Sequence, residues 1–291
     1  MVTFVVSLIG GFSLGGTYAL IALGMVLVFR ATETFNFAHG ELMLLPAFII
    51  GYFQLHNTMP FVPALILALA VTGAVGALFY LLVLRRTTGL SPFIGLIATL
   101  GLAAVMDGAM TLIFGSNDFS LTIPALPKGV VVIFGARISA ASLVFTVLTL
   151  VLGGVVAGVL RFTHLGTQVR AAGQNAILAA QGGIHVRRLY TASWVVAAIL
   201  AGIAGVCYGS VNIVDLSVTQ LALAAIPAIM LGGLDSIEGA LVGGILIGIM
   251  QGFVAGYLGG QYLDVITYSV LLLVLLIIPQ GLFGTKQVTR A

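Results

Sequence analysis

Residues 61–84 read FVPALILALAVTGAVGALFYLLVL, an apolar run that contains no charged side chain and is followed at once by Arg85 and Arg86. A helix needs about 20 mostly apolar residues to cross the hydrocarbon layer of a bilayer. A charge at the centre of such a helix costs about 2.5–3.5 kcal/mol, so charged residues mark the borders of membrane spans. The run therefore predicts a transmembrane helix and places the chain among the integral membrane proteins.

The composition of the whole chain agrees with this prediction. Hydrophobic residues make up 60% of the 291 positions and charged residues only 7%, against about 25% in ordinary soluble proteins. Too few polar side chains remain to cover a water-exposed surface, which excludes a soluble enzyme domain and a disordered chain. The single cysteine, Cys207, excludes an internal disulfide scaffold. The 11 Lys and Arg residues form no basic stripe, so no nucleic acid partner is expected.

The apolar stretches between charged residues predict an all-α polytopic membrane protein with about nine transmembrane segments, within a range of about eight to ten. The stretch 35–54 is interrupted by polar residues and Pro46, and the stretch 216–234 is short and contains Pro227. We expect broken or re-entrant helices there, which membranes tolerate where the freed backbone lines a cavity. The predicted spans are 2–29, 35–54, 61–84, 92–114, 138–160, 189–211, 216–234, 239–258 and 263–279.

The positively charged residues predict the orientation, because Lys and Arg gather in cytoplasmic loops. With the N-terminus outside and the C-terminus in the cytoplasm, only Lys128 and Arg137 lie on the outer side. Residues 115–137 then form an external excursion, with 130–134 as a short extended piece. No Lys or Arg precedes Arg30, so a cleaved signal peptide is not expected. The charges predicted to be cytoplasmic are Arg30, Arg85, Arg86, Arg161, Arg170, Arg187, Arg188, Lys286 and Arg290.

The longest polar tract, residues 161–188, is a predicted cytoplasmic loop. It contains an Ala-rich run from Arg170 to Ala180 that is followed by Gly182 and Gly183. Good helix formers that end at paired glycines indicate a helix with a C-terminal stop. We therefore expect one short amphipathic helix outside the bilayer over residues 166–184.

Motifs for catalysis and nucleotide binding are missing from the sequence. The phosphate loop GxxxxGK[ST] does not occur, and neither do HExxH, CxxC or GxSxG. The four histidines lie far apart, so we expect no enzyme activity, no metal site and no cofactor in this chain. The 38 glycines instead predict close packing of membrane helices, with some of them breaking helices beside a pathway.

Polar residues inside apolar segments are the candidates for a translocation pathway. For the group at 36–41, an alternative role is an interfacial helix start, with Asn36 as the cap and Glu41 near the positive end of the helix dipole. Asp107 is expected to face the protein interior, since a carboxylate in lipid costs several kcal/mol, and to bond a neighbouring helix if it has no transport role. Asp235 and Glu238 have the alternative role of solvated loop charges. The pathway candidates are Asn36, His39, Glu41, Asp107 and Asp235.

Four segments of the chain share a pattern with one family of transport proteins. The first runs from Ala22 through Arg30 to NFAHGE at 36–41, and the second is the loop 166–184. The third is LGGLDSIEGA at 231–240 and the fourth is PQGLFG at 279–284. In this order they resemble LivH-type permeases of branched-chain amino-acid ABC transporters. Glu238 differs from the Pro that the family commonly has there, and Ile278 from an Arg that often precedes the closing Pro.

The resemblance implies the membrane subunit of an ATP-driven importer of branched-chain amino acids in the bacterial inner membrane. The chain would form a single permease domain over residues 1–291. Its partners would be a second, LivM-type permease, two ABC ATPase subunits that bind ATP and Mg²⁺, and a periplasmic solute-binding protein. The chain itself would hydrolyse no ATP. The loop 161–188 would dock on an ATPase through Arg170, Ala171, Ala172, Gly173, Gly182, Gly183 and Ile184.

Three other interpretations stay open at this point. An ABC permease for urea, short amides or aromatic acids would carry the same motifs, since the binding protein sets most of the specificity. A secondary transporter driven by protons or sodium would use Asp107 and Glu41 as coupling carboxylates and would work without partners. An intramembrane enzyme would need a convergent catalytic pair, which the sequence does not contain.

Overall fold

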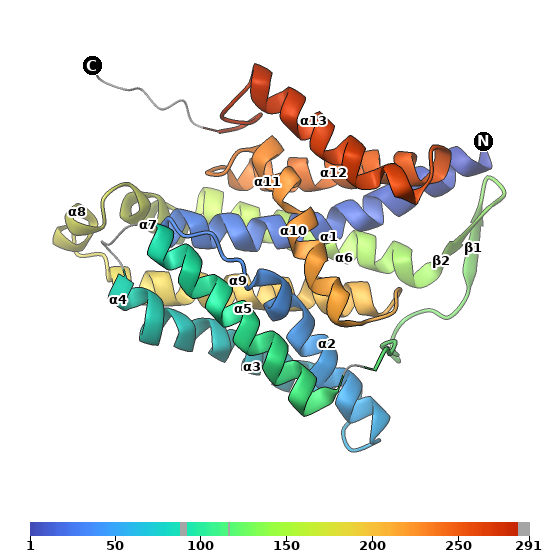
Figure 1. Ribbon diagram of the computed structural model, residues 1–291, viewed down its shortest axis with the longest axis horizontal. Helices are drawn as coiled ribbons and strands as arrows, with labels where there is room; N and C mark the ends of the chain where they lie inside the picture. Colours follow the sequence, from blue (N-terminus) through green and yellow to red (C-terminus); the bar gives the residue numbers. More distant parts are fainter. Residues whose placement is uncertain (88–91, 116, 285–291) are drawn as a thin grey trace. The chain divides into compact units, whose positions relative to one another are not determined.

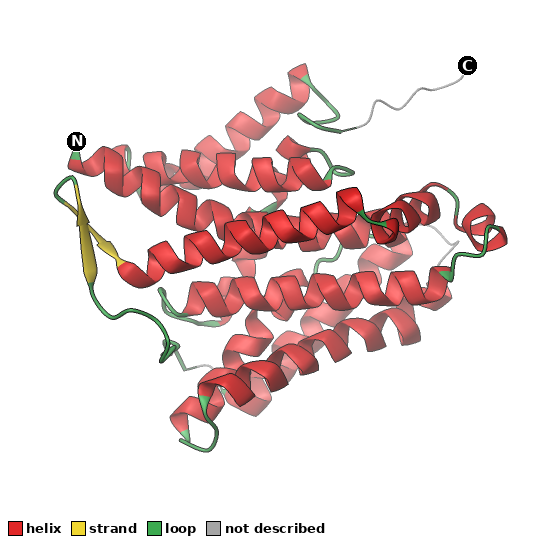
Figure 2. Ribbon diagram, turned by 180° about the vertical axis from the view of Figure 1, so that it is seen from behind, coloured by secondary structure: helices red, strands yellow, loops and turns green. Residues whose placement is uncertain are grey.

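The computed structural model describes residues 1–87, 92–115 and 117–284, and these are mostly helical (Figures 1 and 2). Among the described residues, seven helices are long and apolar enough to cross a membrane, so the chain is a polytopic membrane protein. Lys286 and Arg290 of the predicted cytoplasmic tail lie outside the described residues. The seven are α1 (Val2–Thr32), α3 (Phe61–Phe79) continued by the π-helical η1 (Tyr80–Leu84) and α4 (Arg85–Thr87), α5 (Pro92–Phe114), α6 (Ala140–Phe162), α9 (Val186–Gly209), α12 (Ile237–Tyr257) and η3 (Gly260–Tyr262) with α13 (Leu263–Ile277).

Only one of the two stretches that the sequence marks as weak is a divided helix in the structure. In the first, α1 ends at Thr32 and α2 (His39–Leu55) begins only at His39, with Pro46 inside it. The second divides into a 3-10 turn η2 (Leu216–Thr219) and two short helices, α10 (Gln220–Ala224) and α11 (Ile226–Gly232). The predicted broken helix is therefore confirmed at 216–234, whereas 35–54 forms one continuous helix, α2, after a non-helical start. At 216–234 the local cause is Pro227 in the first turn of α11, because proline has no backbone N–H to donate to a preceding turn.

The predicted external piece at 130–134 is half of a β-hairpin, drawn in yellow in Figure 2. Strand β1 (Val130–Ile133) pairs antiparallel with β2 (Ala136–Ser139), and Val130 lies opposite Ser139. The turn residues Phe134 and Gly135 have φ of +48° and +82°, as a tight two-residue hairpin requires. The next helix therefore begins at Ala140, slightly later than the predicted 138.

The chain forms two compact units, each assembled from separate parts of the sequence. The first unit contains Met1–Val26, Leu126–Ala157 and the chain from Ala224 onward. Within it, α1 and α12 approach through glycines: a Cβ added at Gly248 would lie 2.2 Å from the Cα of Gly15. Small residues spaced four apart allow such backbone contact in membranes. Glycine thus has the packing role in this unit that the sequence predicts.

Two of the family-like segments contact each other in the first unit. The backbone N–H of Leu282 donates to the carbonyl of Leu231 at 2.8 Å, and that of Phe283 donates to Gly232 at 2.9 Å. A Cβ at Gly233, which has φ of +112°, would lie 2.6 Å from the backbone nitrogen of Gly284. The segment 279–284 is therefore fixed on the end of α11 by backbone groups, which explains why its glycines are needed.

Gln251 of α12 is buried in the first unit and links three helices. Its Oε1 accepts a hydrogen bond from the Tyr18 hydroxyl at 2.9 Å, and its Nε2 donates to Thr267 Oγ1 at 3.0 Å. We expect Gln251→Leu to lower the free energy of unfolding by about 1–3 kcal/mol, since two buried groups lose a partner. Thermal unfolding in detergent measures this. Gln261→Leu, at an exposed position, is the matched control, and equal stability of both variants would contradict the prediction.

The second unit contains Leu27–Ala125 and Gly158–Leu223, and α9 forms its centre. Trp194 of α9 is completely buried. On one side α2 lies so close that a Cβ at Gly205 would be 1.9 Å from the Met43 carbonyl oxygen. On another side α3 approaches until a Cβ at Gly76 would be 2.9 Å from the Trp194 carbonyl oxygen. α9 therefore holds α2, with its predicted site residues, in a fixed position.

Candidate functional site

The non-helical segment 33–38 is held by a side chain from α5. Thr99 is completely buried, and its Oγ1 accepts from the backbone N–H of Phe37 at 3.3 Å and lies 3.1 Å from the Phe35 carbonyl oxygen. Backbone groups outside a helix need such partners in apolar surroundings. Thr99 therefore stabilises the break between α1 and α2, a role that the sequence alone does not reveal.

Asn36 and His39 are buried at this break, with exposed fractions of 1% and 0%. Asn36 Oδ1 accepts from the backbone N–H of Ala38 at 3.1 Å, and Asn36 Nδ2 lies 3.4 Å from His39 Nδ1. The alternative that Asn36 caps α2 is wrong, because the cap residue is Ala38 and no side chain caps the helix. Asn36 instead closes the turn that leads into α2 and orients the imidazole of His39.

Glu41 lies half-buried in the first turn of α2. Its Oε2 atom is buried and has no hydrogen-bond partner among the residues that the structure describes. The N-terminal end of a helix favours a negative charge there. Asp107 of α5 lies near enough to act on Glu41 electrostatically. The structure thus brings four of the predicted pathway residues, Asn36, His39, Glu41 and Asp107, into one region of the second unit.

The turn η2, part of the divided stretch 216–232, contacts the start of α2. A Cβ at Gly40 would lie 2.4 Å from the Thr219 carbonyl oxygen and 2.9 Å from its Cα, so only glycine fits. Asp215 starts η2 by accepting from the backbone N–H of Ser217 at 2.6 Å. Transporters place solute and ion sites at such breaks, where helix ends and free carbonyls are available. Thr219 is a site residue that sequence reasoning missed, although the broken pattern at 216–234 signalled its region.

Asp107 does not face the protein interior as predicted. Its side chain is exposed, whereas Met106 and Met110 on the same helix are 7% and 2% exposed. The prediction failed because α5 is apolar around its whole circumference, so hydrophobicity does not show which face packs against the protein.

We expect Asp107→Asn not to lower the free energy of unfolding, because the side chain is exposed on a membrane span and an amide costs less there than a carboxylate. Thermal unfolding of the purified chain in detergent is the measurement. Thr99→Val, which removes a buried hydrogen-bonding group nearby, provides the contrasting variant and should destabilise. A loss of more than about 1 kcal/mol in Asp107→Asn would show that the carboxylate is packed after all.

Asp235 lies in the first unit, in the loop between α11 and α12, where it is half-buried. The next residue, Ser236, caps α12: its Oγ accepts from the backbone N–H of Gly239 at 2.9 Å. The segment 233–236 is therefore a turn that starts a helix, and Asp235 carries negative charge near the positive end of that helix.

The predicted coupling helix at 166–184 is two helices. α7 (His164–Gln174) and α8 (Ala176–Gln181) are separated at Asn175, which has φ of −158°. Asn175 Oδ1 accepts from the backbone N–H of Leu178 at 2.9 Å and so caps α8. Arg170 lies within α7 and does not begin the helix. The predicted stop is present: Gly182 follows α8, and Gly183 has φ of +86°.

Two hydrogen bonds hold α7 on the membrane helices of its unit. The Tyr190 hydroxyl of α9 donates to the Ala172 carbonyl at 3.0 Å, and Arg170 Nη1 donates to the Leu160 carbonyl of α6 at 2.9 Å. A Cβ at Gly173 would lie 2.4 Å from the Arg30 carbonyl oxygen. Three of the residues that the sequence proposed for ATPase contact therefore contact the membrane helices of their unit: Arg170, Ala172 and Gly173.

The part of this loop that projects outward is apolar. Ile177 and Leu178 of α8 are 72% and 62% exposed, and Figure 1 shows α8 projecting beyond the start of α9. These two aliphatic side chains lie next to each other on α8, a helix of six residues, and neither is buried within the unit. Sequence reasoning missed these two residues because they lie within a helix-forming run that was read only for its small side chains.

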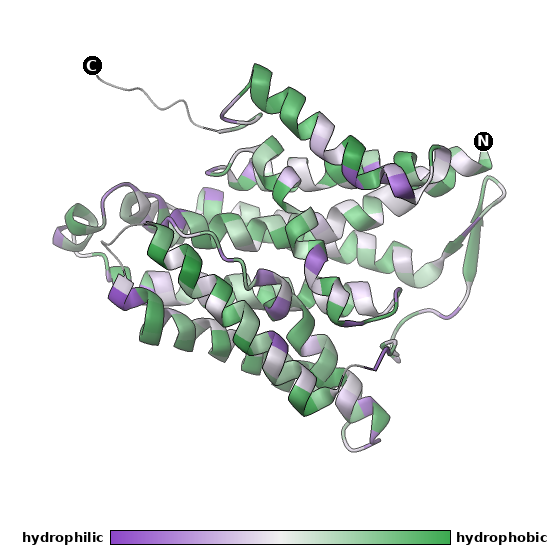
Figure 3. Ribbon diagram, viewed as in Figure 1, coloured by the Kyte–Doolittle hydropathy of each residue, from purple (hydrophilic) through white to green (hydrophobic). Residues whose placement is uncertain are grey.

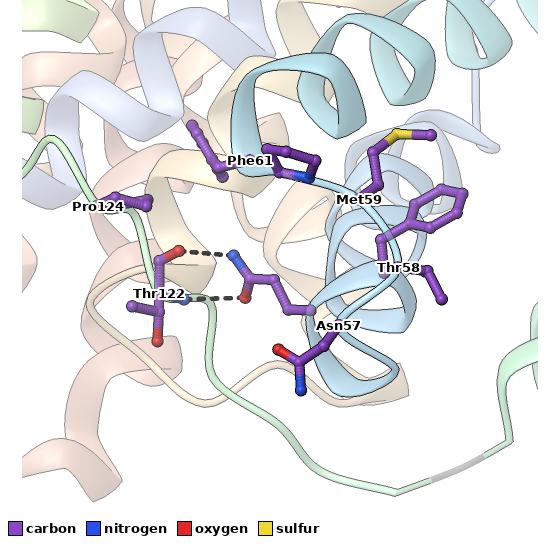
Figure 4. Close-up of a pocket in the computed structure, with 9 residues that line it drawn as sticks. Asn57, Thr58, Met59, Phe61, Thr122 and Pro124 are labelled. Atoms are coloured by element: carbon purple, nitrogen blue, oxygen red, sulfur yellow. Dashed lines mark hydrogen bonds between the residues drawn. The ribbon is translucent and has the colours of Figure 1, made fainter.

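A pocket of about 520 Å³ lies where α2 ends and α3 begins (Figure 4). Gln54 uses both atoms of its amide to pair with the backbone of Thr122: Nε2 donates to the carbonyl at 2.6 Å and Oε1 accepts from the N–H at 3.1 Å. Asn57, Met59 and Phe61 form other parts of the wall. None of the predicted site residues lines this pocket. The amide group of Gln54 holds the segment that contains Thr122 in place.

Comparisons with known proteins cover almost the entire chain. The sequence pattern of the family described as "Branched-chain amino acid transport system / permease component" matches residues 7–278. The high-affinity branched-chain amino acid transport system permease protein BraD of Pseudomonas aeruginosa is 32% identical over 97% of this chain and 96% of its own length. LivH of Escherichia coli K12, with the same description, is 29% identical over 99% and 97%. Among solved structures, PsaBC from Streptococcus pneumoniae in complex with Fab covers 96% of this chain and 93% of that chain at 11% identity, with a TM-score of 0.49.

Proposed function

The chain belongs to the branched-chain amino acid transport system permease family and is a multi-pass permease subunit of an ABC importer, and we propose that its solute is a branched-chain amino acid. The observation that carries the proposal is similarity over nearly full length to relatives that are named for this solute class. Membership of the family sets aside the secondary transporter and the intramembrane enzyme. An ABC permease for urea, short amides or aromatic acids is the alternative that the test below addresses.

The transporter requires further subunits. The proposed partners are a LivM-type second permease, two ATPase subunits that bind ATP and Mg²⁺, and a periplasmic binding protein. The absence of a phosphate loop from the sequence supports separate ATPases. The exposed Ile177 and Leu178 on α8 provide an apolar surface for one of them.

The proposed orientation has nine crossings, with the N-terminus outside and the C-terminus in the cytoplasm. The seven long helices supply seven crossings, and α2 and the segment 216–232 supply the other two. With this orientation, the α7–α8 loop is cytoplasmic, and the β-hairpin and the pocket beside Gln54 are external. The positive charges of Arg85, Arg86, Arg187 and Arg188 on the cytoplasmic side support it.

The proposed pathway passes the break between α1 and α2. Amino-acid solutes carry an ammonium and a carboxylate group, and helix breaks offer carbonyl oxygens and N–H groups to both. Glu41 supplies negative charge for the ammonium group from an Oε2 atom that has no partner among the described residues. His39 and Asn36 line the same break. When the ATPases close on ATP, the α7–α8 loop moves with them and transmits the motion through Ala172 to α9.

We expect Glu41→Gln to lower solute uptake about 10- to 100-fold, because hydrogen bonds to charged groups contribute about 1.5–3 kcal/mol. The measurement is ATP-dependent uptake of labelled leucine by cells that express the assembled transporter, normalised to the amount of chain in the membrane. Asp118→Asn removes one carboxylate in an exposed segment and is the control. Undiminished uptake by Glu41→Gln would exclude Glu41 from the pathway.

The solute class is tested with the complete transporter in proteoliposomes, with binding protein outside and ATP inside. Labelled leucine is offered against an excess of isoleucine, urea, acetamide or phenylalanine. Competition by isoleucine alone supports a branched-chain amino acid. Stronger competition by urea, acetamide or phenylalanine would show that the competitor, and not a branched-chain amino acid, is the preferred solute. Uptake without the ATPases would overturn the ATP-driven mechanism.

A further inference from the structure

A groove of about 590 Å³ runs along the outer face of α9 beside η1. The residues of α9 that line it recur at helical spacing and therefore share one face of the helix. The other face, with Tyr190, Trp194 and Ala197, is 5%, 0% and 1% exposed and packs in the second unit. The groove therefore lies on the side of α9 that is turned away from the packed core of the unit.

The groove is positively charged at one end and apolar at the other. Arg187 and Arg188 are exposed in the first turn of α9, and Thr191 lies one turn further on. Two turns along the helix, Val195 and Val196 continue the lining, with Leu81 of η1 as the facing wall. Along the axis of α9, the groove therefore changes from guanidinium groups at one end to aliphatic side chains at the other.

A contact between η1 and α9 brings a further arginine near the positively charged end of the groove. The ring centroids of Tyr80 and Tyr190 lie 6.1 Å apart, and α4 begins only five residues beyond the start of η1, at Arg85. Arg85 and Arg187 both lie near enough to act electrostatically on Tyr80. Figure 3 shows hydrophilic colour at α4, next to the apolar length of α3. The ends of two neighbouring spans therefore bring Arg85 and Arg187 near the same tyrosine.

The facing wall has an unusual backbone. Leu81 belongs to the π-helical stretch Tyr80–Leu84, which widens the end of an otherwise regular α-helix. Such π-helical turns are rare and occur frequently at functional sites. One wall of the groove is therefore formed by a π-helical turn.

We propose that this groove binds one anionic phospholipid, with the phosphate between Arg187 and Arg188 and an acyl chain along Leu81 and Val195. Guanidinium groups bind phosphate oxygens in pairs, and the ends of membrane spans lie at the level of lipid headgroups. A free phosphate would leave the apolar part of the groove unfilled. The inference goes beyond the proposed solute and depends only on the chain being embedded in a membrane.

The test is lipid retention by the full chain purified in detergent, measured by native mass spectrometry with equal amounts of phosphatidylglycerol and phosphatidylcholine. We expect preferential retention of phosphatidylglycerol. An arginine near the membrane surface contributes about fivefold to binding of an anionic lipid, so Arg187→Gln should lower retention about fivefold and Arg187→Gln with Arg188→Gln about 25-fold. Arg161→Gln, at the exposed end of α6 and outside the groove, is the matched control and should retain the lipid.

A second variant and a second probe separate lipid binding from simple charge attraction. Ala192→Trp keeps every arginine but fills the groove at an exposed position, so the fold should persist while retention is lost. Glycerol 3-phosphate has the phosphate without acyl chains and should not displace the lipid. Displacement by glycerol 3-phosphate, full retention in the double arginine variant, or equal losses in Arg161→Gln and Arg187→Gln would each overturn the proposal. Loss of the lipid when ATPase subunits bind would also overturn it, since the groove would then be a subunit interface.

Discussion

Gly40→Val is expected to abolish uptake and to lower the amount of folded chain, because residue 40 touches backbone and not a movable side chain. A Cβ there would lie 2.4 Å from the Thr219 carbonyl oxygen and 2.9 Å from its Cα. Inserting bulk into a packed contact costs about 1–3 kcal/mol, and more where backbone has to move. The start of α2 and the turn η2 meet at this point, so the displacement changes the first turn of α2, which contains His39 and Glu41.

The measurement pairs membrane yield and thermal unfolding with leucine uptake by the assembled transporter. Gly101→Val on α5 is the matched control, since no atom lies within 4 Å of a Cβ built there and the β-branched side chain is the same. Gly40→Ala adds only the Cβ and should already impair uptake. If Gly40→Val transports as well as Gly101→Val, η2 does not pack against α2 as described.

Much of the fold was predictable from hydrophobic runs, because spans need length and lack charge. The predicted stretches 61–84 and 92–114 match the helices Phe61–Thr87 and α5 closely. The break at 216–234 was predictable as well, since Pro227 interrupts that run, whereas Pro46 lies inside the continuous helix α2. The sequence of a uniformly apolar helix does not show which of its sides packs against the protein. For that reason the prediction placed Asp107 on the wrong side of α5.

The candidate site was predictable in its residues but not in its contacts. Asn36, His39 and Glu41 stood out as polar groups in an apolar segment. Thr99 and Thr219 complete the site from positions far away in sequence, and their ordinary side chains give no signal. The break at Asn175 had a local signal, because asparagine favours the start of a helix, but the Ala-rich run on both sides of it indicated a single helix.

Replacing Ile177 and Leu178 together by Asp is expected to prevent binding of the proposed ATPase and to abolish ATP-driven uptake. Each aliphatic side chain contributes about 1.5–3 kcal/mol when it is fully buried. Loss of both, at 72% and 62% exposure in the isolated chain, corresponds to about a hundredfold or more in affinity. The chain itself should remain folded, because neither side chain is buried in it.

Copurification of the ATPase with the chain, together with solute-stimulated ATP hydrolysis, provides the measurement. Gln181→Glu adds charge at an exposed position of the same helix and controls for charge alone. We expect a different result for Ala172→Leu. Residue 172 is 2% exposed and its carbonyl accepts a hydrogen bond from Tyr190, so a larger side chain should displace α7 and lower the free energy of unfolding. Normal copurification of the Ile177 and Leu178 variant, with loss of copurification in Gln181→Glu, would show that the ATPase does not dock on these two apolar side chains.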